Sequence, residues 1–363
     1  MNNTIGTAVT LTLFGESHGA AVGAVIDGLS PGISISCEKI AVALARRAPQ
    51  GESETQRQEK DEFEILSGVF NGKSTGSPIS IIIRNTSVRS DDYSYGTARP
   101  SHADYAAFCK YHGYEDYRGG GHFSGRVTAA LVAAGSIFLE ALNGLNIKIG
   151  THILQCGSAR DRDFEDIRAD IESLESAAFP VLNAESRTLI LAESERAKAE
   201  GDSVGGIVQT GIIGLPAGLG EPFFDSAESL LSHALFSIGG IKGIDFGWGF
   251  EGCTQRGSVF NDAFRMDNGR VITETNHNGG INGGISNGMP VVFRCAVKPT
   301  PSVSLRQRTV DFIEGRNTEI SVHGRHDAAI IRRICPVIDS TAALVVCDML
   351  ARRFGTDVFL RKE

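Results

Sequence analysis

The chain has 363 residues, 41% of them hydrophobic, so it can bury a substantial core as one large domain or as two fused halves. Its formal net charge of -8 argues against non-specific binding to nucleic acid or to an acidic membrane surface, because both are negatively charged and bind positively charged protein surfaces. No apolar run approaches the roughly 20 residues that span a bilayer, and no segment resembles a secretory signal. We therefore expect a cytoplasmic protein with neither a nucleic-acid nor a membrane partner.

The seven cysteines are scattered between Cys37 and Cys347 without a CxxC pair. This distribution favours buried, reduced thiols over a disulfide framework or a zinc site. We expect no metal.

Patterns of strands and helices alternate along the whole chain. Ser36 predicts the start of the first helix as its N-cap, and Pro49 predicts its end. Before residue 150 the sequence predicts strands 8–14, 24–27 and 79–84 and helices 37–47 and 124–142. After residue 203 it shows an apolar segment at 207–215 and predicts strands 289–297 and 319–322 and helices 226–236 and 340–354.

The stretch between these two regions is the most polar and most charged part of the sequence, and we expect a helical excursion near 151–202. Helices elsewhere carry apolar and small residues on more than one face, which predicts burial on both sides. Together these features predict an α+β protein with two related halves, approximately 1–150 and 203–363.

Glycine is unusually abundant, with 43 residues against a usual share of about 7%. Four histidines, at positions 18, 102, 122 and 326, lie beside glycine, serine or arginine in turn-rich segments. A histidine can donate or accept a proton near neutral pH, but a single histidine is more often structural than catalytic. Because four histidines lie in such segments, we consider the hypothesis that they belong to one functional site.

Each of these segments by itself has an ordinary explanation. Ser17 and His18, in Gly-Glu-Ser-His-Gly, fit a β-turn with a solvent-facing histidine better than a nucleophile elbow, because a strand rather than a helix follows. The glycines at 119–121 precede a helix, where backbone amides can hold a phosphate or carboxylate, but glycine before a helix is also common in loops. The late segments 279–284, 298–302 and 324–327 fit either a ligand-binding surface or a hairpin followed by a surface loop.

Two nucleotide-like motifs carry little weight. Gly247, Gly249 and Gly252 have the Gly-x-Gly-x-x-Gly spacing, but no βαβ pattern surrounds them. The Gly72-Lys73-Ser74 sequence lacks the first glycine of a phosphate-binding loop, since Ser67 stands there. A nucleotide-like cofactor would have to be held in some other way.

Several motifs in register resemble the chorismate synthase family over nearly the whole chain. Besides the histidine segments, they are Leu44-Ala45-Arg46-Arg47, Thr55-Gln56-Arg57, Ile65-Leu66-Ser67-Gly68-Val69, Arg89-Ser90-Asp91-Asp92-Tyr93 and Arg99-Pro100-Ser101-His102-Ala103-Asp104-Tyr105. The resemblance implies loss of phosphate and of a ring C–H proton from 5-enolpyruvylshikimate 3-phosphate, giving chorismate, with reduced FMN and no net redox change. It also implies helices sandwiched between antiparallel β-sheets, two duplicated halves and a homotetramer.

The resemblance further assigns roles to individual residues. His18 resembles the acid beside the departing phosphate, and His102 resembles the acid beside the flavin N1 and C2 oxygen. Asp327, with Ser17 as a relay, resembles the pair that helps to deprotonate the flavin N5 position. The arginines that resemble substrate- or flavin-contacting family residues are Arg46, Arg47, Arg99, Arg126 and Arg325.

The expected FMN contacts are His122, Phe123, Ser124, Gly239, Gly240, Gly283, Lys298, Pro299, Thr300, Pro301, Ser302 and Arg325. Many family members have arginine in place of His122 and asparagine-alanine in place of Gly239-Gly240. After Pro49 the chain has Glu52, Ser53 and Glu54 where many relatives have an arginine, which puts a direct NADPH site in doubt. We therefore expect the flavin to be reduced by an outside source, with NADPH left open as the reductant.

Two other classes of function stay open on the residues alone. A metal-dependent phosphohydrolase would use the histidines and aspartates as ligands, although no motif such as H-E-x-x-H is present. A non-catalytic flavin- or anion-binding protein would bind FMN without turnover.

Overall fold

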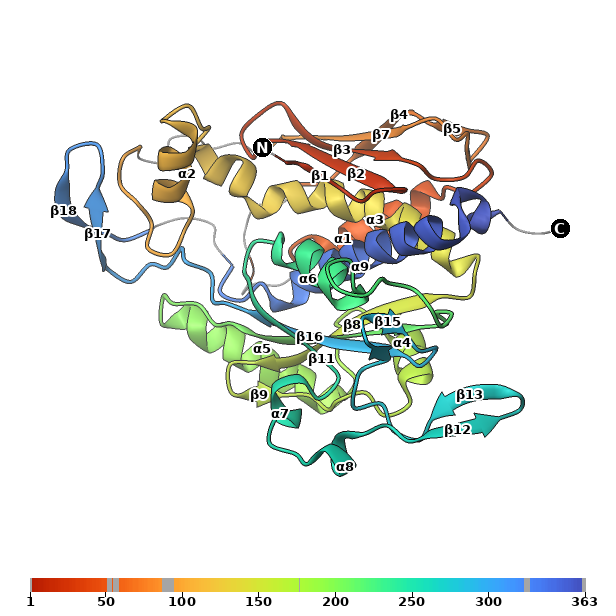
Figure 1. Ribbon diagram of the computed structural model, residues 1–363. Helices are drawn as coiled ribbons and strands as arrows, with labels where there is room; N and C mark the ends of the chain where they lie inside the picture. Colours follow the sequence, from red (N-terminus) through yellow and green to blue (C-terminus); the bar gives the residue numbers. More distant parts are fainter. Residues whose placement is uncertain are drawn as a thin grey trace.

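The computed structural model describes residues 2–50, 54, 59–86, 95–175, 177–322 and 327–360. Two five-stranded sheets, both antiparallel throughout, enclose a layer of helices (Figure 1). The first sheet has the order β1 (Thr4–Ile5), β2 (Thr10–Gly15), β3 (Ala21–Asp27), β7 (Ile79–Arg84), β4 (Phe63–Ser67). The second has the order β11 (Ile241–Phe246), β16 (Val291–Val297), β10 (Gly206–Ile213), β8 (Lys148–Cys156), β9 (Ala159–Arg160). The expected α+β sandwich is confirmed.

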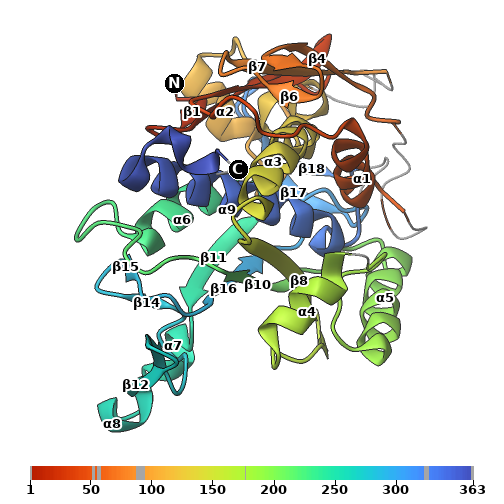
Figure 2. The same cartoon turned by 90° about the vertical axis from the view of Figure 1, so that its right-hand side faces the viewer.

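Four helices lie between the two sheets, and two cover the outer face of the second sheet (Figure 2). The inner helices are α1 (Cys37–Arg47), α3 (Thr128–Asn143), α6 (Ala227–Phe236) and α9 (Ile331–Phe354). The outer ones are α4 (Ile167–Glu175) and α5 (Ala184–Ala199), which form the helical part of the expected polar excursion. Strand β8 runs across position 150 and pairs with β10 of the second sheet, while the internal duplication stays a prediction.

Smaller elements lie around these layers. They are α2 (Asp104–Tyr111), the 3₁₀ turns η2 (Arg118–Phe123), η3 (Gly125–Val127) and η4 (Thr356–Phe359), the short helices α7 (Gly249–Gly252) and α8 (Gly257–Phe260), and the hairpins β5 (Val69–Phe70)–β6 (Lys73–Ser74), β12 (Phe264–Asp267)–β13 (Arg270–Thr273), β14 (Ile281–Asn282)–β15 (Ile285–Ser286) and β17 (Gln307–Asp311)–β18 (Arg316–Ile320). The expected strand 319–322 is thus displaced toward the N-terminus, as β18.

The first helix begins and ends where its sequence predicts. Ser36 Oγ accepts a hydrogen bond from the Lys39 backbone N–H at 3.2 Å, which caps the helix start. Ile40 and Leu44, one turn apart, are buried against the core. The last helical residue precedes Ala48 and Pro49, as expected of a helix that stops before proline.

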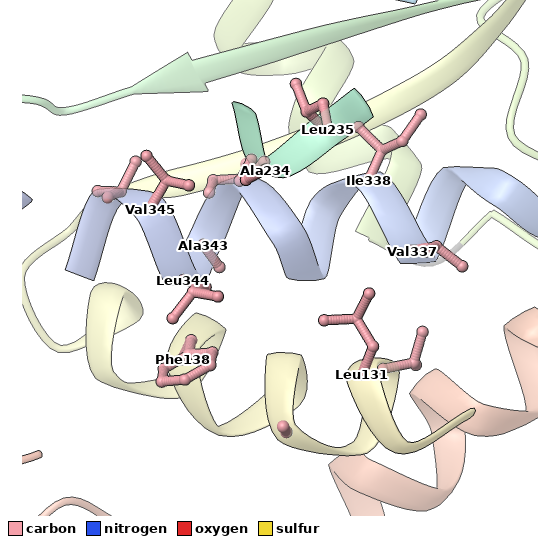
Figure 3. Packing of buried hydrophobic residues seen from close by; sticks show 14 of the residues in the cluster. Leu131, Phe138, Ala234, Leu235, Val337, Ile338, Ala343, Leu344 and Val345 are labelled. Atoms are coloured by element: carbon pink, nitrogen blue, oxygen red, sulfur yellow. The ribbon is translucent and has the colours of Figure 1, made fainter. Parts of the chain in front are cut away.

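The last helix is longer than predicted. It begins at Ile331 rather than Ser340, and Pro336 lies inside it. Proline lacks the N–H that would bond to the carbonyl four residues earlier, so the sequence favours a later start. Burial of the helix against α3 and α6 compensates: in Figure 3, Leu344 points toward Phe138 of α3, and Ile338 lies beside Leu235 of α6.

Two segments, Gly125–Asn143 and Ile331–Phe354, are long and apolar enough to cross a membrane. In the folded chain their apolar windows are 78% and 100% buried between the sheets. Such burial is typical of the core helices of soluble proteins.

Candidate functional site

A turn of three consecutive glycines lies between two of the predicted histidines. Gly119, Gly120 and Gly121 have φ angles of 61°, 80° and 53°, which side-chain-bearing residues rarely adopt. A Cβ on Gly119 would lie 2.5 Å from Nε2 of His18, and one on Gly120 would lie 3.4 Å from Cε1 of His102. The glycines therefore allow both imidazoles to approach one stretch of backbone, and positions 18 and 102 meet in space.

The loop that carries Ser17 and His18 is bonded to this turn. The Ser17 backbone N–H donates to the Gly121 carbonyl at 3.0 Å. His122 Nδ1 donates to the Gly15 carbonyl at 2.8 Å, so that side of the imidazole joins the two loops. Ser17 is fully buried. Two hydrogen bonds thus join segments that lie about 100 positions apart in the sequence.

The orientation of His102 is set by a carboxylate. Asp104 Oδ1 lies 2.6 Å from His102 Nδ1, and Arg99 binds the same carboxylate through Nε (2.8 Å) and NH2 (2.7 Å). Burial raises the pKa of Asp104, but the hydrogen bonds from Arg99 and His102 outweigh it, so the pKa lies well below its usual range. A carboxylate only accepts, so Nδ1 carries the proton and Nε2 is left for a reacting group.

Asp104 is a residue of the candidate site that the motifs did not single out, although it lies in the quoted Arg99–Tyr105 run. The available signal is an arginine, a histidine and an aspartate within six residues, with the aspartate as the first residue of a helix. The side chain of Arg99, an expected substrate contact, is engaged with Asp104.

A cavity of about 160 Å³ lies beside His102 and Asp104. Arg99, His102, Gly120 and Phe123 contribute to its wall. The aromatic rings that line it are Tyr95, Tyr117, Phe123 and Phe312, and Tyr95 and Tyr117 have centroids 4.9 Å apart. Flat aromatic walls suit a flat conjugated ring.

Two of the predicted arginines share one buried carboxylate. Arg47 NH2 lies 2.8 Å from Asp61, and Arg126 NH1 pairs with Asp61 and, at 2.8 Å, with Glu59. Burial raises the pKa of Asp61, but Arg47 and Arg126 outweigh it and leave the pKa lowered. The Arg47 and Arg126 side chains are only 6% and 4% exposed. Arg47 Nε is buried and has no hydrogen-bond partner among the residues that the structure describes.

The start of α9 connects α1 to Asp327. Arg333 Nε donates to the Arg47 carbonyl at 2.9 Å, and its NH1 pairs with the Asp327 carboxylate. Arg46 NH2 lies 3.9 Å from Asp339 of α9, whose pKa burial raises to about 6 despite this arginine. Asp327 is therefore placed beside the arginine cluster of α1.

The segment 298–302 contacts both the residues around His102 and those around Asp327. Lys298 Nζ donates to the Ser101 carbonyl at 2.7 Å, next to His102, and the Lys298 backbone N–H donates to the Gly240 carbonyl at 2.9 Å. Thr300 Oγ1 donates to the Asp327 carbonyl at 2.7 Å. This segment thus touches the surroundings of both His102 and Asp327.

The same segment has features that suit a phosphate group. Burial and the neighbouring Lys242 lower the pKa of Lys298, as expected of two cations close together. Gly240 has a φ of 103°, and a Cβ added to Gly239 would meet no atom of the described residues within 4 Å, so these residues leave the backbone there open to a ligand. The donor set fits the phosphorylated cofactor that the resemblance implies.

Some of the residues expected to contact FMN are not seen to join the residues around His102 and Asp327. Gly283 lies in the turn of the β14–β15 hairpin, where Gly284 accepts a hydrogen bond from the first residue of α6, Ala227. Gly239 and Gly240 follow the other end of α6, whose ten residues span about 15 Å. Ser124 Oγ accepts from the Arg126 backbone N–H at 3.3 Å and so caps η3. Arg325 and His326 lie outside the described residues.

Comparison with known proteins agrees with the motifs. The family model described as chorismate synthase matches residues 9–351. The chain is 43% identical over 359 residues to a chorismate synthase of Thermococcus kodakarensis, covering 98% of this chain and 99% of that one. It is 44% identical over 355 residues to that of Methanosarcina mazei, covering 96% of each.

A solved structure titled "Crystal Structure of Chorismate Synthase" superposes with a TM-score of 0.76 at 27% identity, covering 97% of this chain and 94% of that one. The match extends over both sheets and the helices between them. The chain is an enzyme that belongs to the chorismate synthase family of lyases.

Proposed function

We propose that the protein converts 5-enolpyruvylshikimate 3-phosphate to chorismate and phosphate by a 1,4-anti elimination that requires reduced FMN. Membership of the family places the enzyme at the chorismate-forming step of the shikimate pathway. The approach of His18 and His102 to adjacent glycines of one turn is the observation that carries the proposal. It gives a single site two imidazoles that can exchange protons near neutral pH.

In this proposal the two histidines have separate tasks. His18 donates a proton to the phosphate as the C–O bond breaks, which turns a poor leaving group into a better one. His102 presents Nε2 toward the cofactor side of the site, because Asp104 holds its Nδ1 proton. Asp104 also stabilises the protonated imidazole.

The segment 298–302, Gly239, Gly240, His122, Phe123 and Ser124 would hold FMN. The Lys298–Lys242 pair supports a phosphate position, and the aromatic cavity beside His102 supports a position for the ring. When bound, reduced FMN supplies the electron density and the proton-accepting N5 position for an elimination without net redox change. Gly283 and Arg325 remain part of the proposed cofactor site.

Asp327 and Ser17 are proposed to accept and relay the proton that must leave the N5 position. Arg333 holds the carboxylate of Asp327, and burial of Ser17 excludes water from the relay. Arg46, Arg47, Arg99, Arg126 and Arg325 are proposed to surround the anionic groups of the substrate. Positive charge fixed there stabilises the departing phosphate without reorganisation.

We further propose a cytoplasmic homotetramer whose flavin is reduced by an outside source, with NADPH as one candidate reductant. Glu54 supports an outside source of electrons. It stands in the segment where many relatives carry an arginine, and its carboxylate is paired with Arg332, so it offers no positive charge to NADPH.

The proposal is tested by an anaerobic assay with dithionite-reduced FMN. We expect phosphate release together with chorismate absorbance, both abolished by oxygen and restored by fresh reduced FMN. His18→Ala and His102→Ala should each lower kcat by about 100-fold, within the usual contribution of general acid catalysis. Absence of product under strictly reducing conditions would exclude the proposed reaction, and full turnover of both variants would exclude the acid roles.

A further inference from the structure

Asn85, the residue that follows β7, is hydrogen-bonded to both ends of the loop that carries Ser17 and His18. The Asn85 side-chain amide, Nδ2, donates to the carbonyls of Glu16 at 2.9 Å and Gly19 at 2.8 Å. The Asn85 backbone N–H donates to the Ala20 carbonyl at 3.1 Å. The loop is therefore held at its beginning and at its end by Asn85.

Arg126 sets the orientation of this amide. Asn85 Oδ1 accepts from Arg126 Nε at 2.9 Å. A guanidinium has only donors, so the amide oxygen must face Arg126 and the amide nitrogen must face the loop. Arg126 is fixed in turn by Glu59, Asp61 and the Arg84 carbonyl. A flip of the Asn85 amide would break all three of its side-chain hydrogen bonds.

The loop is also held from the glycine turn. The Ser17 N–H donates to the Gly121 carbonyl, and a Cβ on Gly119 would collide with the His18 imidazole. The His18 ring thus lies where a side chain at position 119 would stand, so a shift of the loop would move the ring relative to the glycine turn. Misplacement of a reacting group by about 1 Å can cost a factor of roughly 100 in rate.

We propose that Asn85 is a positioning residue, which fixes the loop so that His18 faces the glycine turn opposite His102. The proposal rests on the proposed lyase function and assigns Asn85 no chemical step of its own. Asn85 is half-buried, and its side chain is held by three hydrogen bonds.

Asn85→Asp in the full-length protein is the sharpest test. Aspartate has the same size and still accepts from Arg126, but it has no N–H to donate to Glu16 and Gly19. We expect kcat to fall at least tenfold with KM for the phosphorylated substrate within about twofold, the pattern of an interaction that acts in the transition state. We also expect amide hydrogen exchange of residues 15–20 to accelerate at least tenfold, with the exchange of α9 unchanged.

Two further variants separate positioning from general damage. Asn85→Ala also removes the acceptor for Arg126 and should be at least as impaired as Asn85→Asp. Arg84→Ala changes the neighbouring residue, whose exposed side chain pairs with exposed Glu64, and should behave like the wild type.

Wild-type kcat in Asn85→Asp would overturn the proposal, whatever the exchange rates are. Faster exchange throughout the chain, α9 included, would also overturn it, because the residue would then be purely structural. If the wild-type protein itself releases no phosphate, the proposed function fails, whereas the exchange of residues 15–20 in Asn85→Asp still decides whether Asn85 holds the loop.

Discussion

His102 Nδ1 lies 2.6 Å from Asp104 Oδ1, and Arg99 donates hydrogen bonds to both oxygens of the same carboxylate. This contact fixes the proton on Nδ1 and leaves Nε2 beside Gly120. The contact with Asp104 therefore favours the tautomer with the proton on Nδ1 and orients the ring.

Replacement of Asp104 by asparagine should separate these effects. The amide keeps the shape but no longer attracts the Nδ1 proton as a carboxylate does, so both tautomers become populated. We expect kcat to fall by about 10- to 100-fold, within the range for general acid–base groups. Nitrogen-15 NMR of the His102 ring checks the tautomer directly, and a single unchanged tautomer with wild-type kcat would contradict the assigned role.

A methyl group at Gly119 should disturb His18. Gly119→Ala places its Cβ 2.5 Å from the ring and forces alanine to a φ of 61°, which costs about 1–2 kcal/mol per residue. We expect turnover to drop at least tenfold. Gly125→Ala is the matched control, because its Cβ would meet no atom within 4 Å. Equal activity of the two variants in the phosphate-release assay would rule out close packing of His18 on the turn.

Removal of the Lys298 charge should weaken cofactor binding. A hydrogen bond to a charged group contributes about 1.5–3 kcal/mol, so Lys298→Met should raise the Kd for FMN by roughly tenfold or more. The surface variant Lys39→Met, which breaks an exposed pair with Glu140, should leave the Kd unchanged. Fluorescence titration of FMN measures both, and equal Kd values would remove Lys298 from the cofactor site.

The lowered pKa of Asp61 predicts how stability changes with pH. Burial alone raises this pKa, but Arg47 and Arg126 outweigh it. A carboxyl with a lower pKa in the folded state stabilises the fold above its unfolded pKa, near 3.8, and loses that contribution as the pH falls through the folded value. Urea unfolding should therefore show a free energy of unfolding that decreases below about pH 4.

Asp61→Asn should destabilise the protein at pH 7 by about 3–5 kcal/mol, because two buried guanidinium groups lose their shared carboxylate. Glu64→Gln breaks the exposed pair with Arg84 and should cost less than about 1 kcal/mol. Similar unfolding midpoints for the two variants would show that Asp61 does not neutralise the buried arginines.

The local signals in the sequence were sufficient for several elements and for the family. Ser36 and Pro49 predicted both ends of α1, and the strand patterns predicted β7 and β16 closely. These features depend on contacts within a few residues, so a linear pattern contains them. The ordered motifs identified the chorismate synthase family because many short segments had to agree at once.

The tertiary structure decided which residues act together, because the necessary contacts join positions far apart in the chain. The sequence cannot state that Asn85 holds the loop at 16–19, that Asp61 neutralises Arg47 and Arg126, or that Gly119 faces His18. An arginine in a motif can bind a ligand or a buried carboxylate, and only the fold supplies the second partner. Similarly, α9 passes through Pro336 because burial on all sides outweighs one lost hydrogen bond, an energy balance that exists only in the packed molecule.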